Sequence, residues 1–376
     1  MLKKYLIFLP EVQENVEEEW RQCLKQVRDI HVAGYKLIKL NIFTDLPDYE
    51  AYIKVSQEIG KTILDDFDDQ YPAVNVTVHP PEKPWKVAVE AGYLNTDSSE
   101  VISKVWNSIP YIVSKSDSGK EVWAGSLGAG LFPADTRRAA SAAFDQMRAI
   151  LDAEHMSFNH LVRQWNYIGN ILEVKNGIQN YQIFNEVRSE NYHNYRSVPG
   201  YPAATGVGMK HGGVKLDFCA VEAEKSIKII AIDNPDQIKP YEYGQQVLKG
   251  VHPPQFERAV LMTGNRDSTL FVSGTASILG QETIGIEDVD KQTVVTIENI
   301  NKLYNSSRIR QLTGNTETDA GRLALLRVYI KNQSDFVKVK SICQEHFPGV
   351  LALYIEADIC RDNLLVEIEA EFSNFF

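Results

Sequence analysis

The chain of 376 residues is long enough for two or three domains of about 100–200 residues each. Apolar residues make up 44% and charged residues 24% of it, as in a soluble globular protein. The net charge of −11 argues against a general nucleic-acid-binding surface, which needs clustered Lys and Arg. The N-terminal apolar run, Tyr5–Leu9, is too short for a signal peptide or a membrane span. These features predict a cytoplasmic protein that binds neither nucleic acid nor membrane.

The first hundred residues carry the pattern helix, strand, helix, strand, strand. Pro47 is placed to open the second of these helices. The expected ranges are a helix over Val12–Ile30, a strand over Tyr35–Phe43, a helix from Pro47 to about Asp66, and strands over Ala73–His79 and Trp85–Tyr93.

The same pattern returns from about Ile109, now preceded by a hairpin that turns at Asp117-Ser-Gly119. Its helices are recognised by apolar residues at helical spacing. The expected ranges are strands Tyr111–Lys115 and Glu121–Ala124, a helix after Asp135, a strand Leu161–Ile168, a helix at about Asn180–Tyr192, and strands Gly206–Lys210 and Gly213–Glu222.

A linker rich in Tyr, Gln and Pro, with a strand at Lys228–Ile232, precedes a third copy of the pattern. The hairpin of this copy turns at Gly264-Asn-Arg-Asp267. The expected ranges are strands Ala259–Thr263 and Thr269–Ser273, a helix over Val289–Tyr304, a strand Leu323–Ile330, a helix Ser334–His346, and strands Leu351–Glu356 and Asn363–Phe372.

The chain therefore contains an internal repeat of roughly 100–120 residues, β-β-α-β-α-β-β, which is complete twice and lacks its first hairpin once. The predicted fold is α+β, with three units forming a pseudo-trimer that has its sheets inside and its helices outside. Separate domains are the alternative arrangement. The predicted boundaries are a truncated unit at 1–97, a unit at 106–223, a linker at 224–254 and a unit at 255–376.

The last strand places two carboxylates, Glu367 and Glu369, on one face and apolar residues on the other. Adjacent carboxylates repel one another unless something uses or compensates them, so this strand is a candidate site, with a solvated outer face as the alternative. Cys360 precedes Glu367 by seven residues. At the position of Glu367, the second copy is predicted to carry Asp217 and the first Ala88.

The third copy contains Leu270-Phe-Val-Ser-Gly-Thr-Ala-Ser277, Asp288-Val-Asp-Lys-Gln292 with Asn299, and Val366-Glu-Ile-Glu-Ala370, and on these residues it resembles the RidA/YjgF superfamily. A wider set of motifs is Val162-Arg-Gln-Trp-Asn-Tyr-Ile168, Tyr181 with Phe184-Asn185 and Arg188, Gly200-Tyr-Pro-Ala-Ala-Thr-Gly-Val-Gly208, Phe271-Val-Ser-Gly-Thr-Ala-Ser277, Asp358-Ile-Cys-Arg361 and Leu364-Leu-Val-Glu-Ile-Glu369. On this set, residues 110–372 resemble more narrowly the chorismatases, which hydrolyse chorismate. The first hundred residues match no motif of the family.

The resemblance implies cofactor-free cleavage of the enolpyruvyl ether of chorismate, with Glu367 as the catalytic acid/base. A Cys at the position of Cys360 marks the branch of the family that makes 3-hydroxybenzoate, whereas the branch that makes a dihydroxycyclohexadiene acid has a small residue there. The product stays open at this point. A carboxyl group protonates a vinyl ether near neutral pH only if burial raises its pKa, and Glu369 is expected to add to that effect.

The two carboxylates of such a substrate require cations, and arginine pairs with a carboxylate through two parallel hydrogen bonds. Arg163, Arg327 and Arg258 are the candidates, although a surface role fits each of them equally well. Arg163 shares a strand face with Trp165 and Tyr167, a combination suited to hold a ring and its carboxylate. Tyr201 is a candidate hydroxyl donor, with a plain turn residue as the alternative.

Scattered cysteines without a CxxC pair, together with the lack of a Walker or GxGxxG motif, predict reduced thiols and neither metal nor organic cofactor. Two further functions stay open, an imine deaminase and a non-catalytic binding protein of the same superfamily. The deaminases use an Arg near the start of the penultimate strand, where this chain has Pro348-Gly-Val-Leu-Ala-Leu-Tyr354. The expected partner is a chorismate-like dicarboxylate, bound by a monomer.

Overall fold

The computed structural model describes residues 3–11, 15–244, 252–264, 268–314, 318 and 320–373. The first unit is a four-stranded sheet with strand order β1-β4-β2-β3 and two helices. Its elements are β1 (Lys3–Phe8), α1 (Val16–Asp29), β2 (Tyr35–Thr44), α2 (Tyr49–Asp66), β3 (Ala73–Thr77) and β4 (Val87–Asn95). The apolar run at the N-terminus is therefore an edge strand, paired with β4, that the sequence reading missed.

The second unit is a seven-stranded sheet with strand order β20-β11-β8-β12-β7-β6-β5. Its own elements are β5 (Ser99–Trp106), β6 (Ile109–Ser116), β7 (Gly119–Leu127), α3 (Thr136–Ala153), β8 (Leu161–Gly169), the small ladder β9 (Val174–Lys175) and β10 (Ile178–Gln179), α4 (Asn180–Tyr195), β11 (Ala203–Met209) and β12 (Val214–Ala223). β5 was not predicted. The strand β20 (Asp358–Ile359) comes from the third unit, so a strand of one unit completes the sheet of another.

The third unit is a six-stranded sheet with strand order β13-β14-β15-β21-β18-β19. Its elements are β13 (Lys228–Ile232), β14 (Ala259–Thr263), β15 (Ser268–Ala276), the ladder β16 (Ile278–Leu279) and β17 (Glu282–Thr283), α6 (Val289–Leu303), α7 (Ser306–Thr313), β18 (Arg322–Ile330), α8 (Phe336–His346), β19 (Ala352–Glu356) and β21 (Val366–Ser373). The predicted linker thus supplies an edge strand, β13. The predicted turn at 264–267 lies mostly outside the described residues.

Each unit contains one β-α-β crossover whose two strands are parallel neighbours: β2 and β3, β8 and β11, and β18 and β19. Strands that follow one another across a turn, such as β11 and β12, are therefore separated by the strand between them in the sheet. Aspartates cap the helices α2, α3 and α6 through their side chains, which fixes where these helices begin. The three capping residues are Asp48, Asp135 and Asp288.

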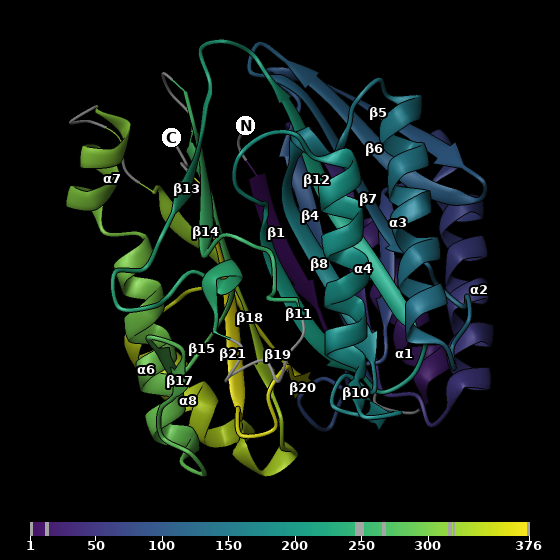
Figure 1. The fold of residues 1–376 in the computed structure, drawn as a ribbon. Coiled ribbons are helices and arrows are strands. Elements are labelled where there is room, and N and C mark those ends of the chain that lie inside the picture. Colours follow the sequence, from purple (N-terminus) through teal and green to yellow (C-terminus); the bar gives the residue numbers. More distant parts are fainter. Residues whose placement is uncertain are drawn as a thin grey trace.

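The buried apolar side chains form one central cluster and three outer clusters. The central cluster takes residues from all three sheets, among them Phe43, Trp165 and Tyr329, whereas each outer cluster lies between one sheet and its own helices. Figure 1 shows the helices on the outside of the sheets. The expected α+β fold, with three repeated units around a common centre, is confirmed. None of the described helices is long and apolar enough to cross a membrane.

Candidate active site

The inner face of β21 is buried along its whole length. Glu367 pairs in register with Tyr329 of β18, and in the second unit Lys215 pairs in the same way with Tyr167 of β8. Lys215, rather than Asp217, is therefore the counterpart of Glu367. The predicted alignment of the two copies was wrong by two residues. Because side chains of a strand point to the same face at every second residue, a shift of two keeps the pattern of apolar and polar residues unchanged.

Asp217 is instead the counterpart of Glu369. Asp217 lies two residues after Lys215 and pairs in register with Trp165. In the same way, Glu369 lies two residues after Glu367 and pairs with Arg327. Its carboxylate accepts a hydrogen bond from Lys39 Nζ at 2.7 Å and one from the Ser126 backbone N–H at 2.9 Å. In the first unit, Ala88 faces Phe43 at the Glu367 position, as predicted.

Glu367 lies in a small cavity where the second and third units meet. The cavity has a volume of about 40 Å³. Its lining comes from α4, β11, the segment before β14, β15 and the segment that leads into β21. The lining residues are Tyr181, Arg188, Ala204, Thr205, Gly206, Phe256, Arg258, Gly274, Ala276, Ile278, Cys360, Leu364 and Glu367.

The carboxyl group of Glu367 is 4% exposed, which overturns the alternative of a solvated outer face. Burial raises its pKa to about 8, and the negative charge of Glu369 adds to this effect. Arg163 and Arg258 act in the opposite direction but do not outweigh burial. At neutral pH this side chain is therefore a protonated acid in a buried pocket.

Gly274 leaves the space that the Glu367 carboxyl occupies. A methyl group at Gly274 would overlap the carboxyl oxygen of Glu367 and lie 3.2 Å from the Thr205 methyl group. The Gly274 backbone N–H donates to Thr205 Oγ1 at 3.1 Å, which ties β15 of the third unit to β11 of the second. A glycine is thus required here by close approach.

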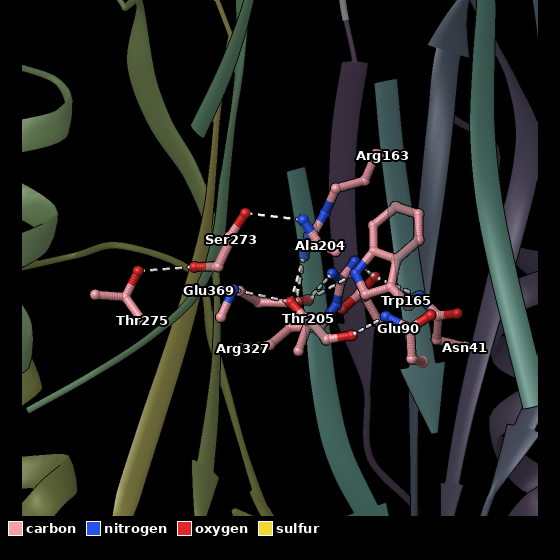
Figure 2. A network of polar contacts seen from close by, with 12 residues as sticks. Asn41, Glu90, Arg163, Trp165, Ala204, Thr205, Ser273, Thr275, Arg327 and Glu369 are labelled. Carbon is pink, nitrogen blue, oxygen red and sulfur yellow. Dashed lines mark hydrogen bonds and ion pairs between the residues drawn. The ribbon is translucent and has the colours of Figure 1, made fainter. Parts of the chain in front are cut away.

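Glu369 lies beside this cavity and is held as an anion by a network of hydrogen bonds (Figure 2). Arg163 Nη2 donates to Glu369 Oε2 at 2.7 Å, and Trp165 Nε1 donates to Oε1 at 3.0 Å. Arg327 Nη1 and the Thr205 hydroxyl also donate to this carboxylate. Burial alone would raise the pKa of Glu369, but the two guanidinium groups outweigh it and hold the pKa below its ordinary value.

The first unit contributes Glu90 to the same network. Arg327 donates from Nη2 to Glu90 Oε1 at 2.6 Å, and Asn41 Nδ2 donates to the same oxygen at 2.9 Å (Figure 2). Arg327 therefore bridges Glu90 of the first unit and Glu369 of the third unit. Arg163, which belongs to the second unit, also contacts Glu369. All three units therefore contribute to the network around Glu369 and Arg327.

Two other arginines, Arg188 and Arg258, line the cavity and are 2% and 3% exposed. Arg188 Nη2 donates to Asn185 Oδ1 at 2.6 Å, and Arg258 Nη2 donates to Tyr243 Oη at 2.6 Å. Neither is ion-paired with a carboxylate in the described part of the chain, and the Nε of each lacks a hydrogen-bond partner there. Such buried, unneutralised cations are suited to bind an anionic ligand.

Tyr181 and Cys360 complete the wall of the cavity. Burial raises the pKa of the Cys360 thiol to about 12, with a smaller contribution from Glu367. Burial likewise raises the pKa of the Tyr181 hydroxyl. Both groups are therefore neutral proton donors at physiological pH, and Cys360 is not a thiolate nucleophile.

The structure brings Glu367, Cys360 and Arg258 together in the cavity, as the sequence reading expected. Arg163, Arg327 and Glu369 lie in the adjoining network, where their charges neutralise one another, and do not line the cavity. Tyr201 lines a different cavity, between α4 and the segment around Tyr241, and stacks on Tyr192 with ring centroids 5.5 Å apart.

The sequence reading did not select Tyr181, Arg188 or Phe256 as site residues. Tyr181 and Arg188 were noted only as carriers of the family resemblance. Their spacing of seven residues places both on one face of a helix, and this was the available signal. Phe256 carries no signal in the sequence, because it becomes part of the wall only through the meeting of two units.

Comparison with known proteins supports the resemblance. Residues 133–220 match the family model described as chorismatase FkbO/Hyg5-like, N-terminal. The chain is 32% identical over 223 residues to a 3-hydroxybenzoate synthase of Streptomyces hygroscopicus, which covers 57% of this chain and 64% of that protein. It is 32% identical over 219 residues to a chorismatase of Streptomyces rapamycinicus, again over 57% of this chain and 64% of the relative.

The chain thus aligns with less than two thirds of the length of these curated relatives. Over its whole length it has the fold of a chorismatase crystal structure, with a TM-score of 0.69, 20% sequence identity and coverage of 98% of both chains. This structural likeness extends to the first unit, for which the sequence offered no match.

Proposed function

We propose that this chain, which is related to the chorismatases in sequence and has their fold, cleaves the enolpyruvyl ether of chorismate and releases pyruvate. One observation carries the proposal: a protonated, buried carboxyl group, Glu367, shares a cavity with two buried arginines that have no carboxylate partner in the described part of the chain. A substrate with two carboxylates and an acid-labile vinyl ether matches this set of groups.

The first chemical step is a proton transfer from Glu367 to the methylene carbon of the enolpyruvyl group. The transfer converts the vinyl ether into an oxocarbenium ion, which is trapped by water or by a neighbouring hydroxyl group. When water is the nucleophile, the tetrahedral carbon expels the ether oxygen, which takes up the proton that the water has lost, and pyruvate leaves. When the neighbouring hydroxyl is the nucleophile, the bond from its oxygen to the ring breaks as well, so this oxygen leaves as the ketone oxygen of pyruvate and the ring loses a proton to become aromatic. A general acid works best when its pKa is near the operating pH, and a pKa of about 8 meets this condition.

Glu369 supports this step without touching the substrate. Because Arg163 and Arg327 keep Glu369 ionised, its charge favours the protonated form of Glu367 in the ground state. After the proton has left, the Glu367 carboxylate faces the oxocarbenium ion, and the two opposite charges stabilise one another in a buried site. Of the two carboxyl groups, Glu367 is therefore the one proposed to act as the acid, because Glu369 stays ionised.

Arg188 and Arg258 are proposed to bind the two carboxylates of the substrate. The cavity volume of about 40 Å³ is far below the roughly 300–1,000 Å³ of ligand pockets. Substrate entry therefore requires that side chains of the wall move apart. Arg188 would exchange its hydrogen bond to Asn185 for a carboxylate, which links substrate binding to this opening.

We assign 3-hydroxybenzoate as the aromatic product. Cys360 lines the cavity next to Glu367, at the position that marks this branch of the family, and one relative is named a 3-hydroxybenzoate synthase. Formation of pyruvate and 3-hydroxybenzoate consumes no water overall. We further propose a cytoplasmic monomer, because the four cysteines are free thiols and the three units already enclose the site within one chain.

Incubation of the purified chain with chorismate tests the proposal. The expected result is equimolar pyruvate and 3-hydroxybenzoate, measured by a coupled assay and by chromatography. Binding of chorismate without release of pyruvate would reject the catalytic role and leave a binding protein. Ammonia release from an imine substrate would instead support the deaminase alternative.

A further inference from the structure

Tyr201 belongs to the wall of a second cavity, the outer cavity, which the proposed mechanism does not use. The outer cavity has a volume of about 670 Å³, whereas the cavity around Glu367 has about 40 Å³. Residues of α4 and of the loop after it line the outer cavity, together with Tyr241, His252 and Gln255. Its volume lies within the roughly 300–1,000 Å³ that small-molecule sites occupy.

The outer cavity and the cavity around Glu367 lie between the same segments of the chain. On α4, Arg188 lines the cavity around Glu367, and Tyr192, one helical turn further on the same face, lines the outer cavity. Opposite α4, Phe256 lines the cavity around Glu367, and the residue before it, Gln255, lines the outer cavity. The two cavities are therefore neighbours, and side chains of these two segments form the boundary between them.

This boundary contains a long hydrogen bond. Gln255 Nε2 donates to Ser189 Oγ of α4 at 3.3 Å, beyond the roughly 2.7–3.2 Å of ordinary N–H···O bonds. The centroid of the half-buried Phe256 ring lies 5.6 Å from Cζ of Arg258. A rotation of the Gln255 and Phe256 side chains would therefore join the two cavities and expose Arg258, one of the two arginines proposed to bind the substrate.

Arg196 gives the outer cavity a positive charge. Its Nε and Nη1 donate to two backbone carbonyls, at 2.8 Å and 2.5 Å. Of the acidic residues nearby, Glu190 is paired with Arg137 at 3.2 Å. The Glu257 carboxyl accepts the Tyr201 backbone N–H at 3.1 Å and does not line the cavity. A carboxylate that enters the outer cavity therefore meets a cation whose charge no ion pair within the described residues neutralises.

Three tyrosines form an aromatic wall in the same cavity. The Tyr201 ring stacks on Tyr192, and its centroid lies 5.2 Å from that of Tyr241. All three residues line the outer cavity. Aromatic faces bind a ring by stacking, and an arginine beside them binds a carboxylate. The outer cavity is therefore suited to a cyclic carboxylate such as chorismate.

We propose that the outer cavity is the route by which chorismate reaches Glu367 and by which the products leave. This inference rests on the proposed function. Arg196 first captures a carboxylate of the substrate, while Tyr201 contacts the ring. The side chains at the boundary then turn aside, and the substrate carboxylates pass to the two arginines beside Glu367.

Ser189→Trp tests the route, because Ser189 lines the outer cavity and an indole ring there fills the boundary. The background is Glu367→Gln, which is expected to bind chorismate without consuming it. Stopped-flow fluorescence measures the rate constants of association and dissociation. Because the same path serves both directions, both should fall by a common factor of about tenfold or more, and Kd should stay within about twofold. An unchanged association rate constant would overturn the proposal, as would a higher Kd that arises from faster dissociation.

Ser189→Ala is the matched control. It removes the bond to Gln255 without filling the cavity, so association should be as fast as before or faster. Arg196→Met should slow association by about threefold or more at low ionic strength and by less at high salt, because a charge at the entrance acts on the encounter. Slow association in Ser189→Ala, or an effect of Arg196→Met that does not depend on salt, would contradict the proposal.

Should Ser189→Trp not fold, Val198→Trp replaces it, since Val198 lines the outer cavity and is exposed. Chorismate that does not bind at all would overturn the proposed function and the route with it. Binding without pyruvate release would overturn the proposed function alone, since the same rate constants still test the route. Pyruvate release with equal rate constants in the plugged and unplugged variants would overturn the route alone.

Discussion

Glu367 and Glu369 lie on the same face of β21, two residues apart, but among the described residues only Glu369 has ion-pair partners. Both carboxyl groups are buried, at 4% and 2% exposure. The arginines that reach Glu369 lower its pKa, and its remaining charge adds to the effect of burial in raising that of Glu367. A repeated Glu on one strand thus yields one anion and one acid, which is the arrangement that general acid catalysis needs.

Glu367→Gln should abolish nearly all pyruvate release while chorismate still binds. Glutamine keeps the shape of the side chain but delivers no proton, and general acids contribute about 10²–10⁴-fold. Steady-state kinetics and calorimetric binding measure the two effects. A loss below about tenfold would place the acid elsewhere. The exposed Glu345→Gln is the control. Asp217→Asn would not serve as one, because it would break the buried pair with Lys39.

The pH dependence should carry the signature of a raised carboxyl pKa. The acid form of Glu367 is lost as the pH rises through about 8, so kcat/KM should fall above that value. Between 4.5 and about 8 the unfolded chain ionises this group while the folded chain keeps the proton. The contribution of Glu367 to the free energy of unfolding therefore decreases as the pH rises across this window, and this contribution stays constant above it.

Because glutamine does not titrate, Glu367→Gln should become progressively more stable than the unsubstituted protein between pH 5 and pH 8. The gain should amount to several kcal/mol at most, at about 1.4 kcal/mol for each pKa unit. Urea unfolding at a series of pH values measures the difference. A gap that stays constant over this range would contradict the raised pKa.

Arg188→Met and Arg258→Met should weaken chorismate binding by about 30-fold or more each, since the loss of one partner of a buried charge pair costs about 2–5 kcal/mol. Each change removes a hydrogen bond, to Asn185 or Tyr243, but also a buried cation that has no carboxylate partner among the described residues, so the melting temperature should fall less than in Arg163→Met. Arg163→Met is the contrasting variant. It leaves Glu369 with one fewer cation, and the protein should be clearly destabilised.

Gly274→Ala should lower kcat while the fold is kept. The added methyl group overlaps the Glu367 carboxyl, which must turn away from the substrate, whereas the surrounding backbone has no need to move. Comparison of kcat with the melting temperature separates the two effects. The same substitution at Gly60, where the methyl group meets nothing within 4 Å, should change neither kcat nor the melting temperature substantially.

Cys360→Ala should change the mixture of products more than the rate of pyruvate release. The first protonation belongs to Glu367, whereas a neutral thiol beside the ring directs a later proton or hydroxyl transfer that a methyl group does not. Chromatography of the products from both proteins measures the ratio. An unchanged ratio would make Cys360 a packing residue of the cavity wall.

The sequence by itself determined the three repeats and most of their helices and strands, and it pointed to the final strand as a candidate site. These follow from local rules: the period of apolar residues, the capping aspartates and the turn residues. The strand predicted within the linker, Lys228–Ile232, has the same bounds as β13 in the structure. The edge strands β1 and β5 were not predicted, because an edge strand gains its partner only in the folded sheet.

The tertiary structure decided which charges remain available. Local pattern does not distinguish Arg163, Arg327, Arg188 and Arg258. Within the residues that the structure describes, however, carboxylates neutralise the first two and not the last two. The neutralising Glu90 comes from the unit without any recognisable motif, 237 residues from Arg327 in the chain. Electrostatic interactions depend on distance and burial in space rather than on separation along the chain, so the free cations of this site became visible only when the three units were assembled.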